Sequence, residues 1–82
     1  MGGKPTRVTN AIRALRFARG EMTQAELAER VGVTRQTVIA IEQGRYSPSL
    51  ETAFLIARAL DARLDEVFAY PEDAADGARA AR

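Results

Sequence analysis

The stretch TQAELAERVGVTRQTVIAIEQG, Thr23 to Gly44, contains two short helical patterns separated by a single glycine. Thr23 and Glu26 have the spacing of a capping box, in which a hydroxyl and a carboxylate each bind a free amide at the start of a helix. Gly32 can adopt a positive φ and so ends that helix, and Thr34 is a favourable N-cap for the next one. The stretch therefore predicts two helices joined by a very short turn.

Small and apolar residues in this stretch occur where two steeply crossing helices require them. Ala28 allows a close approach of the second helix, Val33 can fill the corner, and Val38 and Ile41 return the second helix to a core. Together with Gly32, these positions match the steric pattern of a helix-turn-helix. Because Val38 and Ile41 point inward, the opposite face of the second helix is predicted to face solvent.

The start of the second helix carries residues suited to reading base edges. In a DNA-binding helix-turn-helix, the second helix enters the major groove with its N-terminal residues against the bases. Arginine can donate two hydrogen bonds to guanine, glutamine can pair with adenine, and small side chains can contact a thymine methyl group. We therefore predict base contacts from Arg35, Gln36, Thr37 and Ala40, and also from Gln24 at the start of the first helix of the pair.

Phosphate contacts are predicted on either side of these base contacts. Thr23 and Gln24 begin the first helix of the pair, where free amides and the helix dipole favour an anion. The loop after the second helix offers a positive charge, hydroxyl groups and amides, which set the register on DNA without reading sequence. The residues assigned to phosphate are Thr23, Thr34, Arg45, Tyr46 and Ser47.

Three further helical patterns complete one small domain. They cover residues 10–18, 49–60 and 64–69, with Thr9 or Asn10 capping the first and Arg63, a poor cap, leaving the last to fray. Asp61 stands where a helix-ending residue with positive φ is expected. No alternating run bounded by turns favours strands. The predicted fold is all-α, a compact five-helix bundle whose core contains Ile12, Leu15, Leu27, Ala28, Val31, Val38, Ile41, Leu50, Ala53, Ile56, Leu60, Val67 and Phe68.

Composition and charge narrow the function. The 82 residues include no cysteine and no histidine, and no acid pair is flanked by a nucleophile and a base, so we expect neither an enzyme nor a cofactor or metal. Residues 1–46 carry eight basic and four acidic side chains, whereas residues 47–82 carry four and seven. This polarity suits a protein that offers one end to a polyanion. No apolar run approaches the roughly 20 residues of a membrane span, which predicts a cytoplasmic, nucleoid-associated protein.

The ends of the chain differ from the region between them. Residues 1–9 are expected to form a flexible basic arm, and residues 10–70 the folded domain. Residues 71–82 contain no large apolar side chain and are expected to be disordered.

Residues 10–70, above all MTQAELAERVGVTRQTVIAIEQGRYSPSL and AFLIARAL, resemble the Cro/C1-type helix-turn-helix family of bacterial and phage regulators, in its short single-domain branch. The resemblance implies a phage-repressor-like domain, dimeric operator binding and transcriptional control. It pairs Arg16 with Glu42, tying the first helix to the third. It also implies that the positions facing DNA are Gln24, Thr34, Arg35, Gln36, Thr37 and Ala40.

Three positions depart from the family pattern. The turn from Arg19 to Glu21 is one residue longer than in many relatives, and Arg63 replaces a serine or threonine cap. Ala40 stands where some relatives have a longer polar side chain, which narrows the expected readout of bases.

These observations predict a sequence-specific transcriptional regulator, a repressor, that binds an inverted-repeat operator in double-stranded DNA as a homodimer. One alternative keeps DNA binding but makes the chain an antitoxin that binds a toxin as its protein partner. Another alternative is a helical protein-interaction module that does not bind DNA. The apolar surface assigned to the dimer consists of Leu64, Val67, Phe68 and Tyr70.

Overall fold

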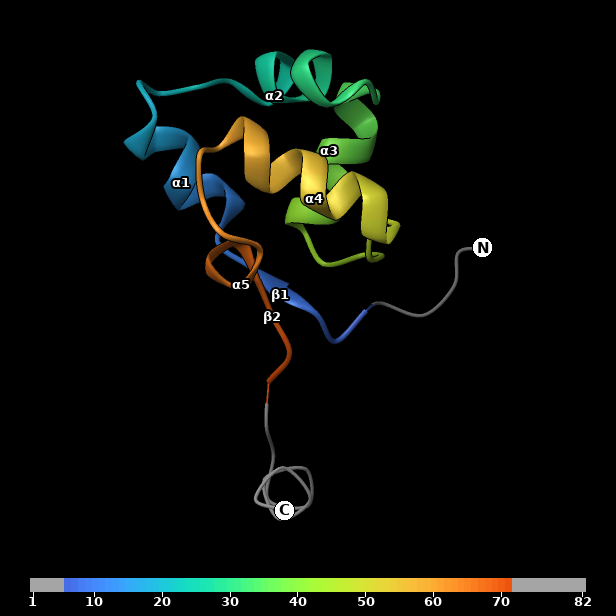
Figure 1. Ribbon diagram of the computed structural model, residues 1–82. Coiled ribbons are helices and arrows are strands. Elements are labelled where there is room, and N and C mark those ends of the chain that lie inside the picture. The colour runs from blue at the N-terminus through green and yellow to red at the C-terminus, as the bar shows by residue number, and fades with distance from the viewer. Residues whose placement is uncertain (1–5, 72–82) are drawn as a thin grey trace.

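The computed structural model describes residues 6–71, which form five helices and one pair of very short strands (Figure 1). α2 lies along one end of the molecule, α4 crosses its middle, and the strands lie at the opposite end. All five predicted helices are present. The elements are β1 (Thr9–Asn10), α1 (Ile12–Ala18), α2 (Gln24–Val31), α3 (Arg35–Glu42), α4 (Leu50–Ala59), α5 (Leu64–Val67) and β2 (Phe68–Ala69).

α2 and α3 meet at the predicted turn. Gly32 has a φ of +87°, and the amides of Gly32 and Val33 both donate to the carbonyl oxygen of Ala28, at 2.8 and 3.0 Å. A residue with a Cβ would be strained at this φ. Ala28 and Val38 are buried, and Val33 packs against the core. The steric pattern of a helix-turn-helix is therefore confirmed.

Side-chain oxygens begin most of the helices as the sequence predicted. The hydroxyls of Thr23, Thr34 and Ser49 each accept a hydrogen bond from the amide three residues further along the chain. At α1 the N-cap residue is Ala11, whose side chain has no acceptor, and the Oδ1 atom of Asn10 instead accepts from the amide of Ile12 at 3.1 Å. These bonds satisfy amides that have no partner within their own helix.

The end of α4 is fixed from two directions. Asp61 adopts the expected left-handed conformation, with a φ of +53°, and its amide donates to the carbonyl oxygen of Arg58. The guanidinium of Arg19 then donates to the carbonyl oxygens of Leu60 and Asp61, at 2.6 and 2.8 Å. This exposed arginine therefore connects the turn after α1 to the end of α4.

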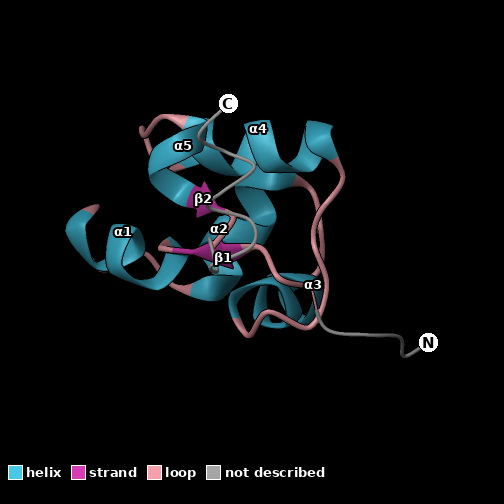
Figure 2. Ribbon diagram, turned by 90° about the horizontal axis from the view of Figure 1, so that it is seen from below, coloured by secondary structure: helices cyan, strands magenta, loops and turns pink. Residues whose placement is uncertain are grey.

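The two strands correct the all-α prediction. α5 ends at Val67 rather than at residue 69, because Phe68 is extended (φ −124°, ψ 146°) and begins β2. β2 pairs with β1 in antiparallel register, Asn10 opposite Phe68 and Thr9 opposite Ala69, and Figure 2 shows the two strands side by side. Thr9 therefore belongs to the folded domain and not to the N-terminal arm. The prediction failed because each strand has only two residues, and the pairing joins distant parts of the chain.

The start of α5 is held, contrary to the expected fraying. The carboxylate of Glu66 reaches back and accepts the amide of Arg63 at 2.6 Å, and the guanidinium of Arg63 lies 3.1 Å from the carboxylate of Asp65. The sequence argument considered only the side chain at the cap position. A glutamate three residues later can supply the missing acceptor by itself.

The core agrees with the sequence at most positions. Leu50 is the clear error: it is 69% exposed, because α4 turns its other side toward the core. Leu15 and Phe68 are half-buried at the edge of the core. Met22 and Ala57 are buried although they were not predicted. The predicted core residues that are buried are Ile12, Leu27, Ala28, Val31, Val38, Ile41, Ala53, Ile56, Leu60 and Val67.

Residues 1–5 and 72–82 lie outside the described residues, and with them most of the predicted arm and nearly all of the predicted tail. Among residues 6–71, no helix combines the length and the apolar composition needed to cross a bilayer.

Candidate nucleic-acid interface

The leading end of α3 is open to solvent. Thr34 lies just before the helix, and its hydroxyl accepts the amide of Thr37 at 3.1 Å and lies 3.0 Å from the hydroxyl of Thr37. The side chains of Arg35 and Gln36 are exposed, and Thr37 is half-buried. The two threonines therefore order the first turn and leave the arginine and the glutamine on the surface.

The rear of α3 is held by apolar packing and by Asn10. Val38 and Ile41 are buried in the core. The Nδ2 atom of Asn10 donates to the carbonyl oxygens of Ile41 and Glu42, at 3.0 and 3.4 Å, while its Oδ1 atom caps α1. One side chain thus joins the start of α1 to the last carbonyl groups of α3. The sequence marked Asn10 only as a cap, because nothing local to it indicates contact with a helix 31 residues away.

Arg16 and Glu42 form the ion pair that the family resemblance implied. The Nε atom of Arg16 lies 2.7 Å from Oε2 of Glu42, and its Nη2 atom donates to Oε1 at 3.2 Å. Each side chain is only 9% exposed. The remaining terminal nitrogen of Arg16 donates to the carbonyl oxygen of Met22 at 2.7 Å. A buried, two-pronged pair of this kind fixes the arrangement of α1, α3 and the turn before α2 more than it adds net stability.

Gln24 takes part in the same network. Its Nε2 atom donates to Oε1 of Glu42 at 3.2 Å, and the side chain is half-buried. The amide is therefore oriented by the carboxylate, and its oxygen and its second N–H are left for a ligand. The sequence assigned Gln24 to base contact, and the structure adds a positioning role between α2 and α3.

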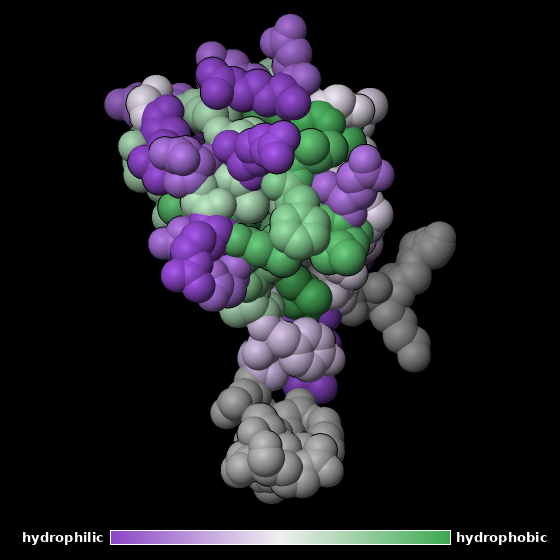
Figure 3. All heavy atoms as spheres, in the orientation of Figure 1, coloured by the Kyte–Doolittle hydropathy of each residue, from purple (hydrophilic) through white to green (hydrophobic). Residues whose placement is uncertain are grey.

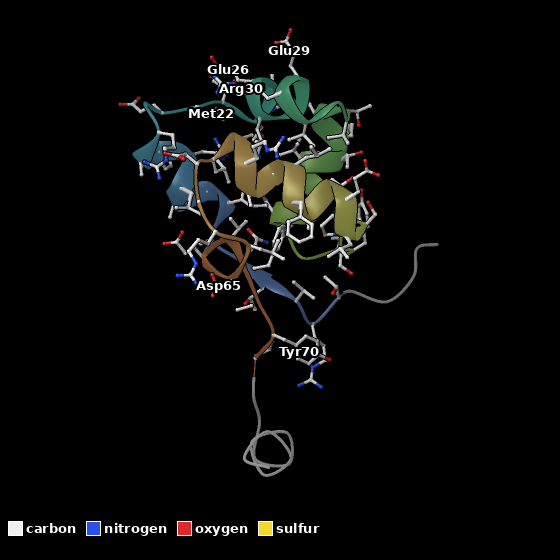
Figure 4. The ribbon with its side chains drawn as sticks, in the orientation of Figure 1. Met22, Glu26, Glu29, Arg30, Asp65 and Tyr70 are labelled. Atoms are coloured by element: carbon white, nitrogen blue, oxygen red, sulfur yellow. The ribbon has the colours of Figure 1, made fainter. Side chains whose placement is uncertain are left out.

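The start of α2 forms the predicted capping box. The hydroxyl of Thr23 accepts the amide of Glu26 at 3.0 Å, and Oε1 of Glu26 accepts the amide of Thr23 at 2.7 Å. These bonds lower the pKa of Glu26 below its usual 4.5, with the backbone bond to Thr23 contributing most, its hydroxyl next, and Arg30 a smaller electrostatic part. Figure 4 shows Glu26 and Arg30 at the outer side of α2, at the other end of the molecule from Tyr70. The amide of Thr23 is therefore occupied and is not free to bind an anion.

The segment after α3 leaves the helix through a Schellman motif. The amide of Arg45 donates to the carbonyl oxygen of Ala40, and the amide of Gly44 donates to the carbonyl oxygen of Ile41, both at 3.0 Å. Gly44 has a φ of +73°. Residues 45–47, at and after this turn, are exposed. Ala40 itself is half-buried, so it offers only a small surface to a ligand.

A groove connects several of these residues. Its walls include Arg13 and Arg16 of α1, Thr23 and Gln24 at the start of α2, and Arg35 of α3. Glu21, Glu42 and Gln43 line it as well, and the charge of Arg16 is paired with that of Glu42. The exposed cations Arg13 and Arg35 and the start of α2 are therefore the features of this depression that favour a polyanion such as a nucleic-acid backbone.

The predicted dimer surface is only partly on the outside. Val67 is 1% exposed and belongs to the core, so its side chain is not available to a partner. Leu64 and Phe68 are half-buried, and Tyr70 is 59% exposed with the guanidinium of Arg7 5.4 Å from the centre of its ring. Val67 was also part of the predicted core, and its burial confirms that assignment.

Residues 6–71 contain no group of three or more acidic side chains placed to hold a metal ion.

A family model of helix-turn-helix proteins matches residues 12–67, which covers α1 to α5. The chain belongs to the Cro/C1-type helix-turn-helix family. Members of this family are DNA-binding transcriptional regulators and not enzymes.

Several relatives of this Cro/C1-type chain are similar over most of its folded part. An uncharacterised HTH-type transcriptional regulator of Methanothermobacter thermautotrophicus is 62% identical over 55 residues, which cover 66% of this chain and 80% of that protein. The regulator YgzD of Bacillus subtilis is 47% identical over 64 residues, 78% of this chain and 96% of its own. Antitoxin HigA1 of Mycobacterium tuberculosis is 42% identical over 65 residues, but this chain spans only 43% of that protein.

Proposed function

We propose that this protein is a transcriptional repressor that reads a specific operator sequence with the leading end of α3. One observation carries the proposal: Arg35 and Gln36 are exposed on a helix whose rear is fixed by Asn10, by the Arg16–Glu42 pair and by the core. A rigid helix with free hydrogen-bonding groups at its start is what major-groove readout needs. A regulator of this kind acts on the chromosome, so we expect it in the cytoplasm.

In the proposed complex, Arg35 makes two bonds to guanine and Gln36 pairs with adenine. Thr37 and Ala40 contribute smaller contacts, for example to a thymine methyl group. One N–H of the Gln24 side chain binds Glu42, and its carbonyl oxygen and second N–H contact a base or a bridging water. The small surface of Ala40 restricts specific readout to the first turns of the helix.

The proposed phosphate contacts flank these bases. Arg45 supplies the charge, and the amides after Thr23 and the groups of residues 45–47 supply further donors. Replacing Arg45 with alanine is expected to weaken binding to all DNA sequences alike. The slope of log affinity against log salt should fall by about one unit, because one fewer counterion is released. A slope equal to that of the unaltered protein would show that Arg45 does not contact a phosphate.

We propose that two copies bind an inverted repeat, so that two α3 helices enter successive major grooves about one helical turn, roughly 34 Å, apart. Selection of bound sequences from random duplexes, followed by footprinting, tests both parts. A selected palindrome with half-sites one turn apart is the expected result. Binding without any selected sequence would overturn operator reading, and selection of a single half-site would overturn the dimer.

The similarity to antitoxin HigA1 favours one second candidate function. The folded domain proposed here for operator binding is the part shared with that longer protein. As an antitoxin, the chain would also bind a toxin, and purification from its native host would yield a complex with a second protein. Recovery of the chain without a second protein would argue for a regulator that acts alone.

A further inference from the structure

The outer side of α4 carries an apolar patch that the fold leaves uncovered. Leu50, Phe54 and Leu55 are 69%, 54% and 37% exposed, and Figure 3 shows apolar surface over the middle of the molecule, where α4 lies. At 100° per residue, these three side chains share one arc of the helix. The opposite arc supplies the core residues Ala53, Ile56, Ala57 and Leu60. The helix is therefore apolar on two sides, and only one of them is packed.

Two other aromatic rings are more than half exposed, those of Phe17 and Tyr70, and both differ from Phe54 in having a cation beside them. Phe17 is 53% exposed, but the guanidinium groups of Arg13 and Arg16 lie 5.7 and 5.9 Å from its ring centre. Tyr70 has Arg7 in the same position at 5.4 Å. Within residues 6–71, no cation lies over the ring of Phe54. This ring therefore remains available to another apolar surface.

Two opposite charges flank the patch on the same side of α4. Glu51 lies in the first turn and Arg58 in the last turn, both are exposed, and neither forms an ion pair within the described part of the chain. A two-fold axis midway between positions 54 and 55 would set two antiparallel copies of α4 side by side. It would place Glu51 of each copy opposite Arg58 of the other, and Phe54 opposite Leu55. The surface is thus complementary to itself, as the interface of a symmetric dimer must be.

We propose that a second copy of this chain covers the outer side of α4, with the two α4 helices antiparallel about that axis. This inference rests on the proposed dimer and assigns it a surface. A partner of the same chain supplies both the apolar side chains and the matching charges. The segment 72–82 supplies no apolar side chain larger than alanine. Antiparallel helices also oppose their dipoles, which favours the arrangement.

The proposed contact extends to α5 and leaves the DNA-binding side open. A groove beside the patch is lined by Leu50, Phe54, Leu55, Arg58 and Leu64, so Leu64 of the original dimer surface remains part of it. Phe68 and Tyr70 line an adjoining depression, which shares Arg63 and Leu64 with this groove. The groove shares no residue with the depression that contains Gln24 and Arg35. Two copies joined through α4 can therefore both present α3.

Charge reversal in the full 82-residue chain tests the pairing. Glu51→Arg alone and Arg58→Glu alone each place like charges opposite each other, and each should weaken the dimer roughly tenfold or more, as judged by sedimentation. Mixing the two single variants should restore dimers, because every Arg then faces a Glu. The double variant Glu51→Arg/Arg58→Glu should also dimerise. If these charges served only the helix dipole, neither combination would restore association, and the proposal would be overturned.

Matched aromatic variants test the apolar contact. Phe54→Ser should dissociate the dimer, whereas Phe17→Ser, at an equally exposed ring, should not change it. Thermal unfolding at a fixed low concentration checks that both variants are folded. A dimer that survives Phe54→Ser but is lost in Tyr70→Ser would overturn the proposal and place the interface at the strands. A wild-type protein that is monomeric both free and on DNA would overturn it as well.

The same samples separate this inference from the proposed function. Binding to a selected half-site depends on Arg35 and should be retained by the Phe54→Ser monomer, at the lower affinity of a single domain. Loss of sequence selection by the wild-type chain would instead reject operator reading, whatever its oligomeric state.

Discussion

The two ends of α3 are built in opposite ways. Its leading end is ordered only by the hydroxyls of Thr34 and Thr37, and its side chains are exposed. Its trailing end is fixed by buried apolar residues, by Asn10 and by a buried ion pair with Arg16. The contrast explains how a helix of eight residues can be held rigidly while the side chains at its start stay exposed to a ligand. Distant parts of the chain supply the rigidity, so the leading residues are free to vary with the sequence that is read.

The largest effect is expected from breaking the trailing end at Glu42. Glu42→Ala leaves the guanidinium of Arg16 buried without its partner and should reduce the free energy of unfolding by about 3–5 kcal/mol. Chemical denaturation measures the loss. Glu29→Ala, at an exposed position of α2, is the control and should change stability by less than about 0.5 kcal/mol.

A double variant separates the charge from the packing at this end. Arg16→Met/Glu42→Leu replaces both charges with apolar side chains, which is often neutral or stabilising when the volume fits. It should therefore recover most of the stability lost in Glu42→Ala. A single variant that is nearly as stable as the wild type would show that solvent reaches the pair and that the trailing end is not rigidly held.

Changing the leading end of α3 should weaken DNA binding and leave the stability of the fold unchanged. Arg35→Ala is expected to cost roughly 1–3 kcal/mol of binding to the preferred site and to relax specificity at one base pair, with an unchanged melting temperature. Competition between the preferred duplex and its single-base variants measures the loss of affinity and of specificity. Arg30→Ala removes the same charge from the outer side of α2 and serves as the control. Equal loss on every sequence would show that Arg35 contacts phosphate rather than a base.

The fold was predictable where the signal lies within one helix or one turn. The capping box at Thr23, the positive φ of Gly32 and of Asp61, and the alternation of buried residues in α2 and α3 follow from local chemistry. The residues Arg35 and Gln36 were found in the same way, because the inward direction of Val38 fixes the outward direction of its neighbours.

The errors have a common cause in contacts between distant segments. The strand pair depends on two dipeptides far apart in the chain, and neither has a pattern of its own. The bonds from Asn10 to the end of α3 have the same character. Leu50 was misassigned to the core because it lies at the start of a helix, where rotation by one position exchanges the surface for the core. Such choices are made by tertiary packing rather than by local periodicity.

A smaller loss is expected at Asn10. Asn10→Ala removes both the donor to the α3 carbonyl groups and the acceptor that caps α1, and should cost about 1–3 kcal/mol of stability. Asn10→Asp keeps the acceptor and loses the donor. The difference between the two variants therefore measures how much of the effect belongs to the trailing end of α3. If Asn10→Asp matches the wild type, the cap of α1 is the whole role of this residue.

The smallest expected effect is on the pH dependence of stability, which should differ between the cap of α2 and the cap of α3. The pKa of Glu26 is lowered in the folded state, so its carboxylate stabilises the fold above its usual pKa of 4.5 and loses that contribution as the pH falls through the lowered value. Glu26→Gln can still reach the amide of Thr23 but does not titrate. The stability of the wild type should therefore exceed that of Glu26→Gln slightly at pH 7, and the difference should disappear in acid. Thr34→Ala, which removes a cap without a titrating group, should cost about 1 kcal/mol at both pH values. A difference for Glu26→Gln that stays constant down to low pH would mean that the amide of Thr23 does not depend on the charged carboxylate.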